Sequence, residues 1–562
     1  MPMYARDDGF LDMNLLLDGL AATGRLDADQ VRLARSDRPE GLHPLEQIAE
    51  LTLEDRQRPG RRLDLDTLCQ WLAERIGVPY LRLDPMQVDL AQVAGLISAG
   101  FAQRHDILAV AADPSAITIA SAQPYRRAWE ADLANGLGRP IRRVLGCPRQ
   151  IRQLRQTLFS LASSVQGASQ QQRTGLNELE QLLQLGNRQL DASADDAHIV
   201  HIVDWILQYA IEQRASDIHL EPRFDQARLR YRIDGLLHQV YAFATGVALA
   251  LVSRLKHLAR MDVAQKRRPQ DGRLKTRLPG GEEVELRLST LPTPFGEKLV
   301  LRLFDPLQLE QGLAGLGLDS PLLERWQQQL RQPHGLVLLT GPTGSGKTST
   351  LYASLRWLAS PALNLCTIED PIERLEPAFN QLQVQPGIGL DFANGVRALL
   401  RQDPDVIMIG EIRDASTAQV AVQAALTGHL VLSTLHTNDA CTAITRLLEL
   451  GVAEYLLKAT LLAVMAQRLV RMRCASCQGA ASRLSQACVV CRGTGYHGRT
   501  GLFELLVLSD SLRARIGPGI DLPAFRRQAR AEGMQDLRRC GADKVARGMT
   551  CDQEVLRACC QG

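Results

Sequence analysis

The fold is decided by the stretch Leu336-Val337-Leu338-Leu339-Thr340-Gly341-Pro342-Thr343-Gly344-Ser345-Gly346-Lys347-Thr348. Its leading apolar residues, bounded by turn residues, are typical of a buried strand. The remainder fits G-x-x-x-x-G-K-[ST], in which glycines let backbone N–H groups converge on phosphate oxygens. A helix directly after the lysine adds the attraction of its positive end. The stretch therefore predicts a strand, a phosphate-binding loop and a helix, in that order.

The phosphate loop predicts binding of ATP together with Mg²⁺. Lys347 is expected to reach the β- and γ-phosphates, and Thr348 to offer its hydroxyl to Mg²⁺. The residues predicted to bind the nucleotide are Gly341, Pro342, Thr343, Gly344, Ser345, Gly346, Lys347, Thr348 and Ser349. The alternative is a glycine-rich turn that meets the pattern by chance, and the acidic clusters downstream argue against it.

Two acidic clusters follow predicted strands further along the chain, Thr367 to Glu373 and Val406 to Asp414. In an open parallel sheet ligands bind beyond the carboxyl ends of the strands, so both clusters are expected to face the nucleotide. One carboxylate is expected to hold the Mg²⁺ shell, while another orients or deprotonates the attacking water. The alternative is that these acidic residues merely cap strands at the surface.

Two histidines, His429 and His436, bracket a further predicted strand, Leu430 to Leu435. A histidine at a strand end is often structural, but these two could contact the γ-phosphate or a neighbouring subunit. The spacing leaves both alternatives open.

Apolar runs alternate with helical patterns from about residue 330 onward, which predicts an α/β domain whose parallel sheet has helices on both faces. Before it, Arg228, Arg230 and Arg232 alternate with apolar residues ahead of an Asp234-Gly235 turn, as in one strand of a hairpin. The alternation from Val284 to Leu288 is similar. These patterns predict a small α+β domain whose polar sheet face carries arginines.

The chain is expected to contain four regions. Residues 1–160 form a mixed α/β region that docks a partner, 161–196 a Ser- and Gln-rich linker, 197–312 the small α+β domain, and 313–562 the nucleotide-binding domain with a metal-binding insert at 470–500. The linker is assigned from its polar composition, which lacks sustained apolar periodicity.

Composition and charge exclude several classes of protein. The chain has 65 Lys plus Arg against 62 Asp plus Glu, and a net charge of +3 gives no general attraction to nucleic acid or anionic lipid. No apolar run reaches the length of about 18 residues that a membrane span needs. The N-terminus also lacks the regions of a signal peptide. We therefore expect a cytoplasmic protein.

Four of the twelve cysteines form two C-x-x-C pairs, Cys474 with Cys477 and Cys488 with Cys491. Thiolates at this spacing can close a tetrahedral Zn²⁺ site, so these cysteines are the predicted metal ligands. The alternative is a chance arrangement. The other cysteines are scattered or terminal and are expected to be structural or incidental.

Together these motifs resemble those of the type II secretion traffic ATPases (GspE/PulE) and their type IV pilus assembly relatives. Gly341–Thr348 resembles the Walker A motif of that family, Thr367–Glu373 its Asp box, Arg401–Asp414 its Walker B motif and Thr427–Thr437 its His box. The resemblance continues through the segments RASDIHLEP, RYRIDG, RPQDGR and LRLSTLPTPFGEKLVLRL between residues 214 and 303.

The resemblance implies a RecA-like core, assembled into a hexamer that couples ATP hydrolysis to type II protein secretion through pseudopilus assembly at the inner membrane. Carried over to the matching positions, it implies Glu373 as the general base, Glu411 as the Walker B carboxylate and His436 as a nucleotide sensor. Arg232 and Arg273 are implied as charge stabilisers that the smaller domain contributes. For each arginine the alternative is the solvated face of a sheet.

The N-terminal region is expected to select the machine. Ile76–Pro85 resembles the entry to the N-terminal domain of secretion ATPases, which docks on the cytoplasmic domain of an inner-membrane assembly protein. The family also implies an inner-membrane platform protein as a partner, so we expect peripheral association with that membrane through protein contacts. Many pilus assembly ATPases carry paired RLG-x-x-L segments, which this chain lacks. This favours secretion, with type IV pilus assembly as the alternative.

Two functions from other classes are weaker alternatives. A nucleic-acid translocase is conceivable because zinc ribbons also bind nucleic acid and Arg468, Arg471 and Arg473 precede the cysteines. Interleaved aromatic residues and a basic stripe are missing there, so no direct nucleic-acid contact is expected. An adaptor that binds ATP without turnover would lack the acidic clusters, and they are present.

Overall fold

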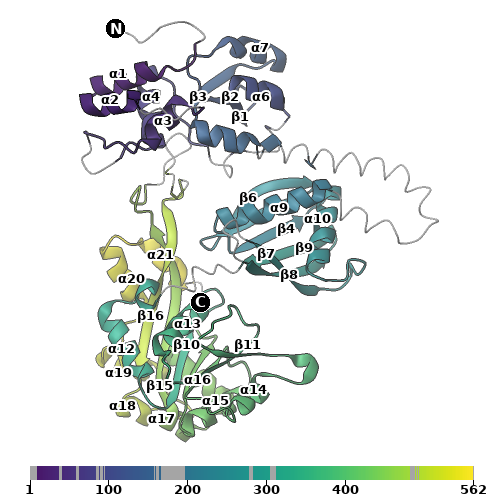
Figure 1. Ribbon diagram of the computed structural model, residues 1–562. Coiled ribbons are helices and arrows are strands. Elements are labelled where there is room, and N and C mark those ends of the chain that lie inside the picture. The colour runs from purple at the N-terminus through teal and green to yellow at the C-terminus, as the bar shows by residue number, and fades with distance from the viewer. Residues whose placement is uncertain are drawn as a thin grey trace, which may run out of the picture. The chain divides into compact units, whose positions relative to one another are not determined.

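A computed structural model of the chain describes residues 9–36, 41–57, 62–83, 88, 93, 95–156, 158–159, 164–165, 197–277, 283–303, 312–480, 488, 490–491 and 493–560. The chain divides into two compact units, residues 1–303 with 480–495 and residues 304–479 with 496–562 (Figure 1). Apart from residues 164 and 165, the expected linker lies outside the described residues.

The second unit is built on a seven-stranded sheet in the order β12-β11-β13-β14-β10-β15-β16. Neighbouring strands are parallel except for β16, which is antiparallel to β15. The carboxyl ends of the parallel strands therefore share one edge. The strands are β10 (Gly335–Thr340), β11 (Leu365–Glu369), β12 (Asn380–Gln383), β13 (Val406–Ile409), β14 (Leu430–Leu435), β15 (Leu461–Arg473) and β16 (Tyr496–Val507).

Helices cover both faces of this sheet. Alternate residues of the strand β10 point to opposite sides, and because both sets are apolar, each face must be covered. Leu336 and Leu338 of β10 pack in one core with α14 to α19, whereas Val337 and Leu339 pack in another with α12 and α13. This confirms the predicted α/β domain. The helices are α12 (Ser320–Leu330), α13 (Lys347–Leu358), α14 (Phe392–Leu399), α15 (Ala415–Leu426), α16 (Ala440–Glu449), α17 (Glu454–Thr460), α18 (Asp510–Ala514) and α19 (Leu522–Ala531), with 3-10 turns η1 (Leu313–Leu316) and η2 (Pro386–Ile388).

The long hairpin of β15 and β16 differs from the expected pattern. β15 is buried on both faces over most of its length, so no apolar–polar alternation marks it as a strand. It pairs with β10 on one side and with β16 on the other (Figure 1). Two C-terminal helices, α20 (Leu537–Ala546) and α21 (Asp552–Cys560), pack against Val470 and Leu502 of this hairpin.

The first unit contains a six-stranded antiparallel sheet in the order β6-β5-β4-β9-β8-β7. Its apolar face packs against α9 (Ala197–Glu212) and α10 (Thr245–Leu258). Asp234 and Gly235 have φ values of 47° and 85° between β5 and β6, which confirms the predicted hairpin. The strands are β4 (Asp217–Pro222), β5 (Gln226–Ile233), β6 (Leu236–Ala244), β7 (Gln270–Arg277), β8 (Glu283–Thr293) and β9 (Gly296–Leu303).

The N-terminal region of the same unit has a three-stranded sheet in the order β1-β2-β3. Its strands are β1 (Ile107–Ala112), β2 (Ile117–Ser121) and β3 (Ile141–Leu145), in keeping with the mixed α/β region expected there. Within the described residues, every helix is too short or too polar to cross a bilayer. Helices of this region include α1 (Met13–Ala22), α2 (Ala28–Ser36), α3 (Pro44–Glu50), α4 (Leu65–Ile76), α6 (Ala99–His105) and α7 (Ala128–Leu137).

Candidate functional site

The phosphate loop lies at the carboxyl edge of the parallel sheet, between the end of β10 and the start of α13. Residues 342–344 at its tip are exposed, whereas Gly341, Ser345 and Lys347 are buried. The hydroxyl of Ser345 is buried and has no hydrogen-bond partner among the described residues. Because an unpaired buried hydroxyl is costly, the loop fits a ligand rich in acceptor oxygens, such as a phosphate chain.

Lys347 folds back onto its own loop. Its Nζ donates to the carbonyl oxygens of Gly341 and Pro342, at 2.7 and 3.1 Å. Burial lowers the pKa of Lys347 to about 8, while the negative charges of Glu411 and Glu373 act in the opposite direction. Both carboxylates are therefore near enough to influence the amine, and phosphate oxygens would favour its protonated form further.

Residues that follow three different strands come together beside the loop. Thr348, directly after the loop that ends β10, places its Oγ1 3.4 Å from Oε1 of Glu373, which follows β11. Glu411 follows β13 and is paired with Arg413. Hydroxyl and carboxylate oxygens are ligands that Mg²⁺ prefers, so this donor set fits the expected metal.

Glu369, in the same acidic cluster as Glu373, is occupied by internal contacts. Its buried carboxylate accepts hydrogen bonds from Tyr352 and Thr367, both at 2.7 Å, and from Gln381 at 3.1 Å. This carboxylate fixes the end of β11, whereas Glu373 lies next to the phosphate loop.

The two histidines lie at opposite ends of β14. His436 follows the carboxyl end, and its Nε2 is 3.3 Å from Oε2 of Glu411. His429 precedes the amino end, where its Nδ1 is 3.0 Å from the carbonyl oxygen of Ala424. Since all parallel strands present their carboxyl ends to the phosphate loop, strand direction places His436 at the site and His429 away from it.

Arg232 and Arg273 lie in the other unit, in one cross-strand row of the six-stranded sheet. Along this row Arg232 is opposite Asp217, Asp217 opposite Arg302, Arg302 opposite Arg287, and Arg287 opposite Arg273. Paired residues of antiparallel strands share a face, so the row carries four arginines against one aspartate. Arg287 and Arg302 could not be assigned to this row from the sequence of either strand alone, because only the register between strands aligns them with Arg232 and Arg273. The segment LRLSTLPTPFGEKLVLRL contained both.

Two residues of β15, Gln467 and Arg468, also lie beside the phosphate loop and were not anticipated. Both are buried, and the hydroxyl of Thr350 in α13 donates to Oε1 of Gln467 at 2.8 Å. The positive charge of Arg468 lies near enough to Lys347 to act on its pKa. No sequence signal placed these residues at the nucleotide site, since β15 itself was not predicted and Arg468 was considered only as a possible nucleic-acid contact.

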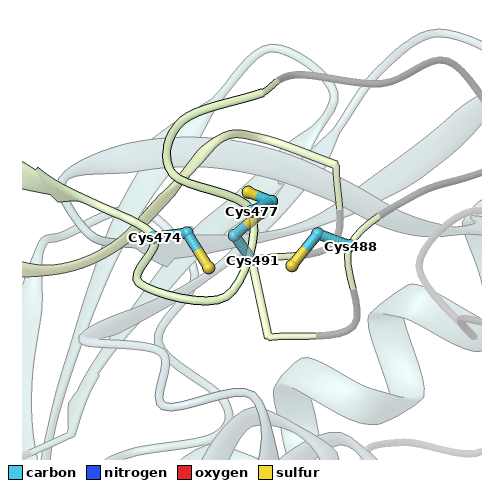
Figure 2. A group of neighbouring side chains, drawn as sticks. All are labelled: Cys474, Cys477, Cys488 and Cys491. Carbon is cyan, nitrogen blue, oxygen red and sulfur yellow. The ribbon is translucent and has the colours of Figure 1, made fainter. Parts of the chain in front are cut away.

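The four predicted metal ligands form one cluster at the end of the β15–β16 hairpin. The Sγ atoms of Cys474, Cys477, Cys488 and Cys491 all lie within 4.8 Å of one another (Figure 2). The backbone N–H of Gly495 donates to Sγ of Cys491 at 3.3 Å. Zn–S bonds of about 2.3 Å would place tetrahedral sulfurs about 3.8 Å apart, so the cluster can hold such a metal.

The arginines that precede this cluster do not form a basic surface. Arg468 is buried, and Arg471 makes a two-pronged ion pair with Glu554, at 3.0 and 2.7 Å. Arg473 is exposed. The run therefore offers little of the positive stripe that nucleic-acid binding needs.

This chain is similar to known proteins of secretion and pilus machines. Residues 192–557 match a family model described as "Type II/IV secretion system protein", and residues 76–165 match the MshEN domain. The chain is 46% identical to the type IV pilus assembly ATPase TfpB of Acinetobacter baylyi, over 97% of this chain and 98% of that protein. It is 47% identical to the type II secretion system protein HxcR of Pseudomonas aeruginosa, over 65% of this chain and 78% of that protein.

Among solved structures, the X-ray structure of the ATPase DotB from Yersinia pseudotuberculosis is similar, with a TM-score of 0.51 and 22% identity, covering 66% of this chain and 95% of that chain. This likeness agrees with the expected RecA-like fold. The family match extends over the phosphate loop, both acidic clusters and the cysteine cluster. The chain therefore belongs to the type II/IV secretion system protein family.

Proposed function

We propose that this chain is an ATP-hydrolysing motor of a type II secretion or type IV pilus machine. The observation that carries the proposal is the meeting of Lys347, Thr348, Glu373 and Glu411 at one edge of the sheet, with His436 beside Glu411. Transfer of a phosphoryl group to water needs compensation of phosphate charge and a positioned water. These side chains supply both.

Each side chain has a distinct proposed role. Lys347 balances the charge of the β- and γ-phosphates, and Thr348 binds Mg²⁺, which would polarise the phosphoryl oxygens when present. Glu373 accepts the proton of the attacking water, and Glu411 orients that water or the metal shell. His436, hydrogen-bonded to Glu411, responds to the state of the γ-phosphate.

Lys347→Ala is expected to abolish hydrolysis and weaken ATP binding, because the phosphates lose their cation. Glu411→Gln should lower kcat by about 100-fold or more while ATP still binds, because the phosphate loop is unchanged. Steady-state hydrolysis and titration with a fluorescent ATP analogue separate the two effects. His429→Ala, at the opposite end of β14, is the matched control and should keep wild-type turnover. Full turnover by Lys347→Ala protein would exclude this site.

We propose that the four-cysteine cluster holds one structural Zn²⁺. Four thiols supplied by the protein leave no open position for a substrate, which is typical of structural rather than catalytic zinc. Cys474 and Cys491 are buried, so the metal would be largely shielded from solvent. Its role would be to hold the ends of β15 and β16 together where the hairpin opens into the insert.

Freshly prepared, reduced protein should contain about one zinc per chain by mass spectrometry of the metal content. A double variant, Cys474→Ser with Cys477→Ser, should lose the metal and melt at a lower temperature. Cys366→Ser, which alters a buried cysteine of β11, is the control and should retain it. Wild-type protein without zinc, or with iron in its place, would contradict the assignment.

We further propose that the nucleotide site is completed in a homo-hexamer. Arg232 and Arg273 belong to the first unit and Lys347 to the second. The family resemblance implies ATP bound between the two domains, with arginines of the smaller domain meeting it. The cross-strand row has an excess of positive charge, and guanidinium groups suit phosphate oxygens because they donate in pairs.

Specific activity should therefore rise with protein concentration, in step with ring formation measured by sedimentation. Arg273→Ala should lower kcat by about 100-fold, because a donor to developing phosphate charge is lost. Lys275→Ala, two residues further along the same face of β7, should have little effect. A monomeric enzyme whose activity per chain does not change with concentration would contradict assembly-dependent catalysis.

The choice between the two machines depends on the N-terminal region. The absence of an RLG-x-x-L pair supports secretion, as does the likeness to HxcR, although that match covers only 65% of the chain. The match to TfpB covers 97% of the chain and so includes the N-terminal region. This region is the proposed docking site for the cytoplasmic domain of an inner-membrane assembly protein. The match to TfpB therefore favours pilus assembly.

Deletion of residues 1–160 should leave ATP binding intact but release the protein from the inner-membrane fraction and stop the machine. The reason is that recruitment is proposed to occur through this region, with the platform protein as a second contact. Removal of the whole gene then separates the machines: loss of pili with normal export supports pilus assembly, and the reverse supports secretion. Truncated protein that still sediments with membranes and functions would contradict the docking role.

A further inference from the structure

Strand β15 brings two buried polar side chains to the phosphate loop. Thr340, the last residue of β10, is paired with Ala466, so Gln467 and Arg468 continue beside the start of the loop. They are 1% and 6% exposed. Burial of an amide and a guanidinium is unfavourable unless both are hydrogen-bonded, so their contacts indicate what holds them there.

Gln467 touches both ends of the loop. Its backbone oxygen lies 2.5 Å from the position that a Cβ on Gly341 would occupy, and its Nε2 lies 2.8 Å from that position on Gly346. These two residues have φ values of +151° and +86°. Glycine is therefore required at both ends of the loop, partly because β15 comes so close.

Arg468 lies between the phosphate loop and the segment that follows His436. Its Nη1 lies 3.1 Å from the Cβ position of Gly341 and donates to the carbonyl oxygen of Gln467 at 3.1 Å. Its Nη2 donates to the carbonyl oxygen of Asn438 at 2.9 Å. Asn438 lies two residues after His436. One guanidinium thus lies beside the loop that presents Lys347 and is hydrogen-bonded to the segment that presents His436.

Arg468 has carboxylates nearby but is not paired with one. Burial lowers the pKa of Arg468, while the negative charges of Glu504 and Asp439 act in the opposite direction. Within the described part of the chain, no carboxylate forms an ion pair with this guanidinium. Glu504 accepts a hydrogen bond from the backbone N–H of Ala440 at 2.9 Å, and Asp439 pairs with Arg526. These carboxylates are already engaged, so the guanidinium is free to direct its N–H groups to the two backbone carbonyls.

We propose that Arg468, supported by Gln467, is a positioning residue for ATP hydrolysis that fixes the phosphate loop relative to the segment His436–Asp439. It acts through Lys347 and His436 and not by contact with the reacting atoms. This inference rests on the proposed ATPase function and adds a residue to it that neither phosphate-loop nor acidic-cluster motifs contain.

Two substitutions test the proposal. Arg468→Gln removes the charge and the two-carbonyl fork, whereas Arg468→Lys keeps the charge but cannot donate to both carbonyls from one plane. The KM for ATP should rise by about tenfold in Arg468→Gln and by a smaller factor in Arg468→Lys. Arg446→Gln, which alters an exposed ion pair on α16, is the control and should keep the wild-type KM.

Hydrogen exchange of the nucleotide-free protein gives a second measurement, independent of turnover. The amides of Gly341, of residues 343–346 and of residues 436–439 should exchange faster together in both Arg468 variants, while those of β13 and α15 stay unchanged. If the wild-type protein did not hydrolyse ATP, the proposed function would be wrong. The exchange pattern could still be measured, so the two failures can be told apart.

Two results would overturn the positioning role. One is a folded Arg468→Gln protein with wild-type KM and unchanged exchange in both segments. The other is a lower kcat at constant KM, with faster exchange across the whole sheet, as expected of a purely structural residue. If Arg468→Gln does not fold, Arg468→Lys decides: wild-type KM and exchange in a protein of normal melting temperature overturn the proposal.

Discussion

The close approach of β15 to the phosphate loop is the contact on which the nucleotide site depends. With the carbonyl of Gln467 only 2.5 Å from a Cβ position at Gly341, no side chain fits there without moving the strand. The loop must then follow a backbone path that needs glycine at Gly341 and Gly346, because the strand beside it leaves no room for a side chain at either position. The packing of β15 therefore determines the backbone path of the loop, on which phosphate binding depends.

The same strand leads from the nucleotide site to the cysteine cluster. Cys474 lies six residues after Arg468, which is about 20 Å along an extended strand. Between them, Val470 packs with Leu537 of α20 and Val555 of α21, and Arg471 pairs with Glu554. A metal that closes the end of the hairpin would keep β15 paired with β16 along its length. Its structural value would extend to the strand that supports the phosphate loop.

How far the sequence could predict the structure differs between strands. β10, β13 and β14 are short, fully buried apolar runs that end in polar motifs, so their place in a parallel sheet could be predicted. β15 combines apolar residues with a buried glutamine and a buried arginine. Its apolar residues follow neither the two-residue period of a half-buried strand nor the 3.6-residue period of a helix, so the sequence does not identify it as a strand. Gln467 and Arg468 were missed for the same reason, because their importance lies in spatial contacts and not in a motif.

Register and strand direction supply what single motifs leave open. Two histidines at equal distance from β14 become distinct only because parallel strands direct one end to the nucleotide. Arg302 and Arg287 join Arg232 and Arg273 only when four antiparallel pairings are known. In the proposed motor these arginines belong to a different unit from Lys347, so no motif around the phosphate loop groups them. They are grouped by the pairing of the antiparallel strands, which puts residues far apart in the sequence on one face of a sheet.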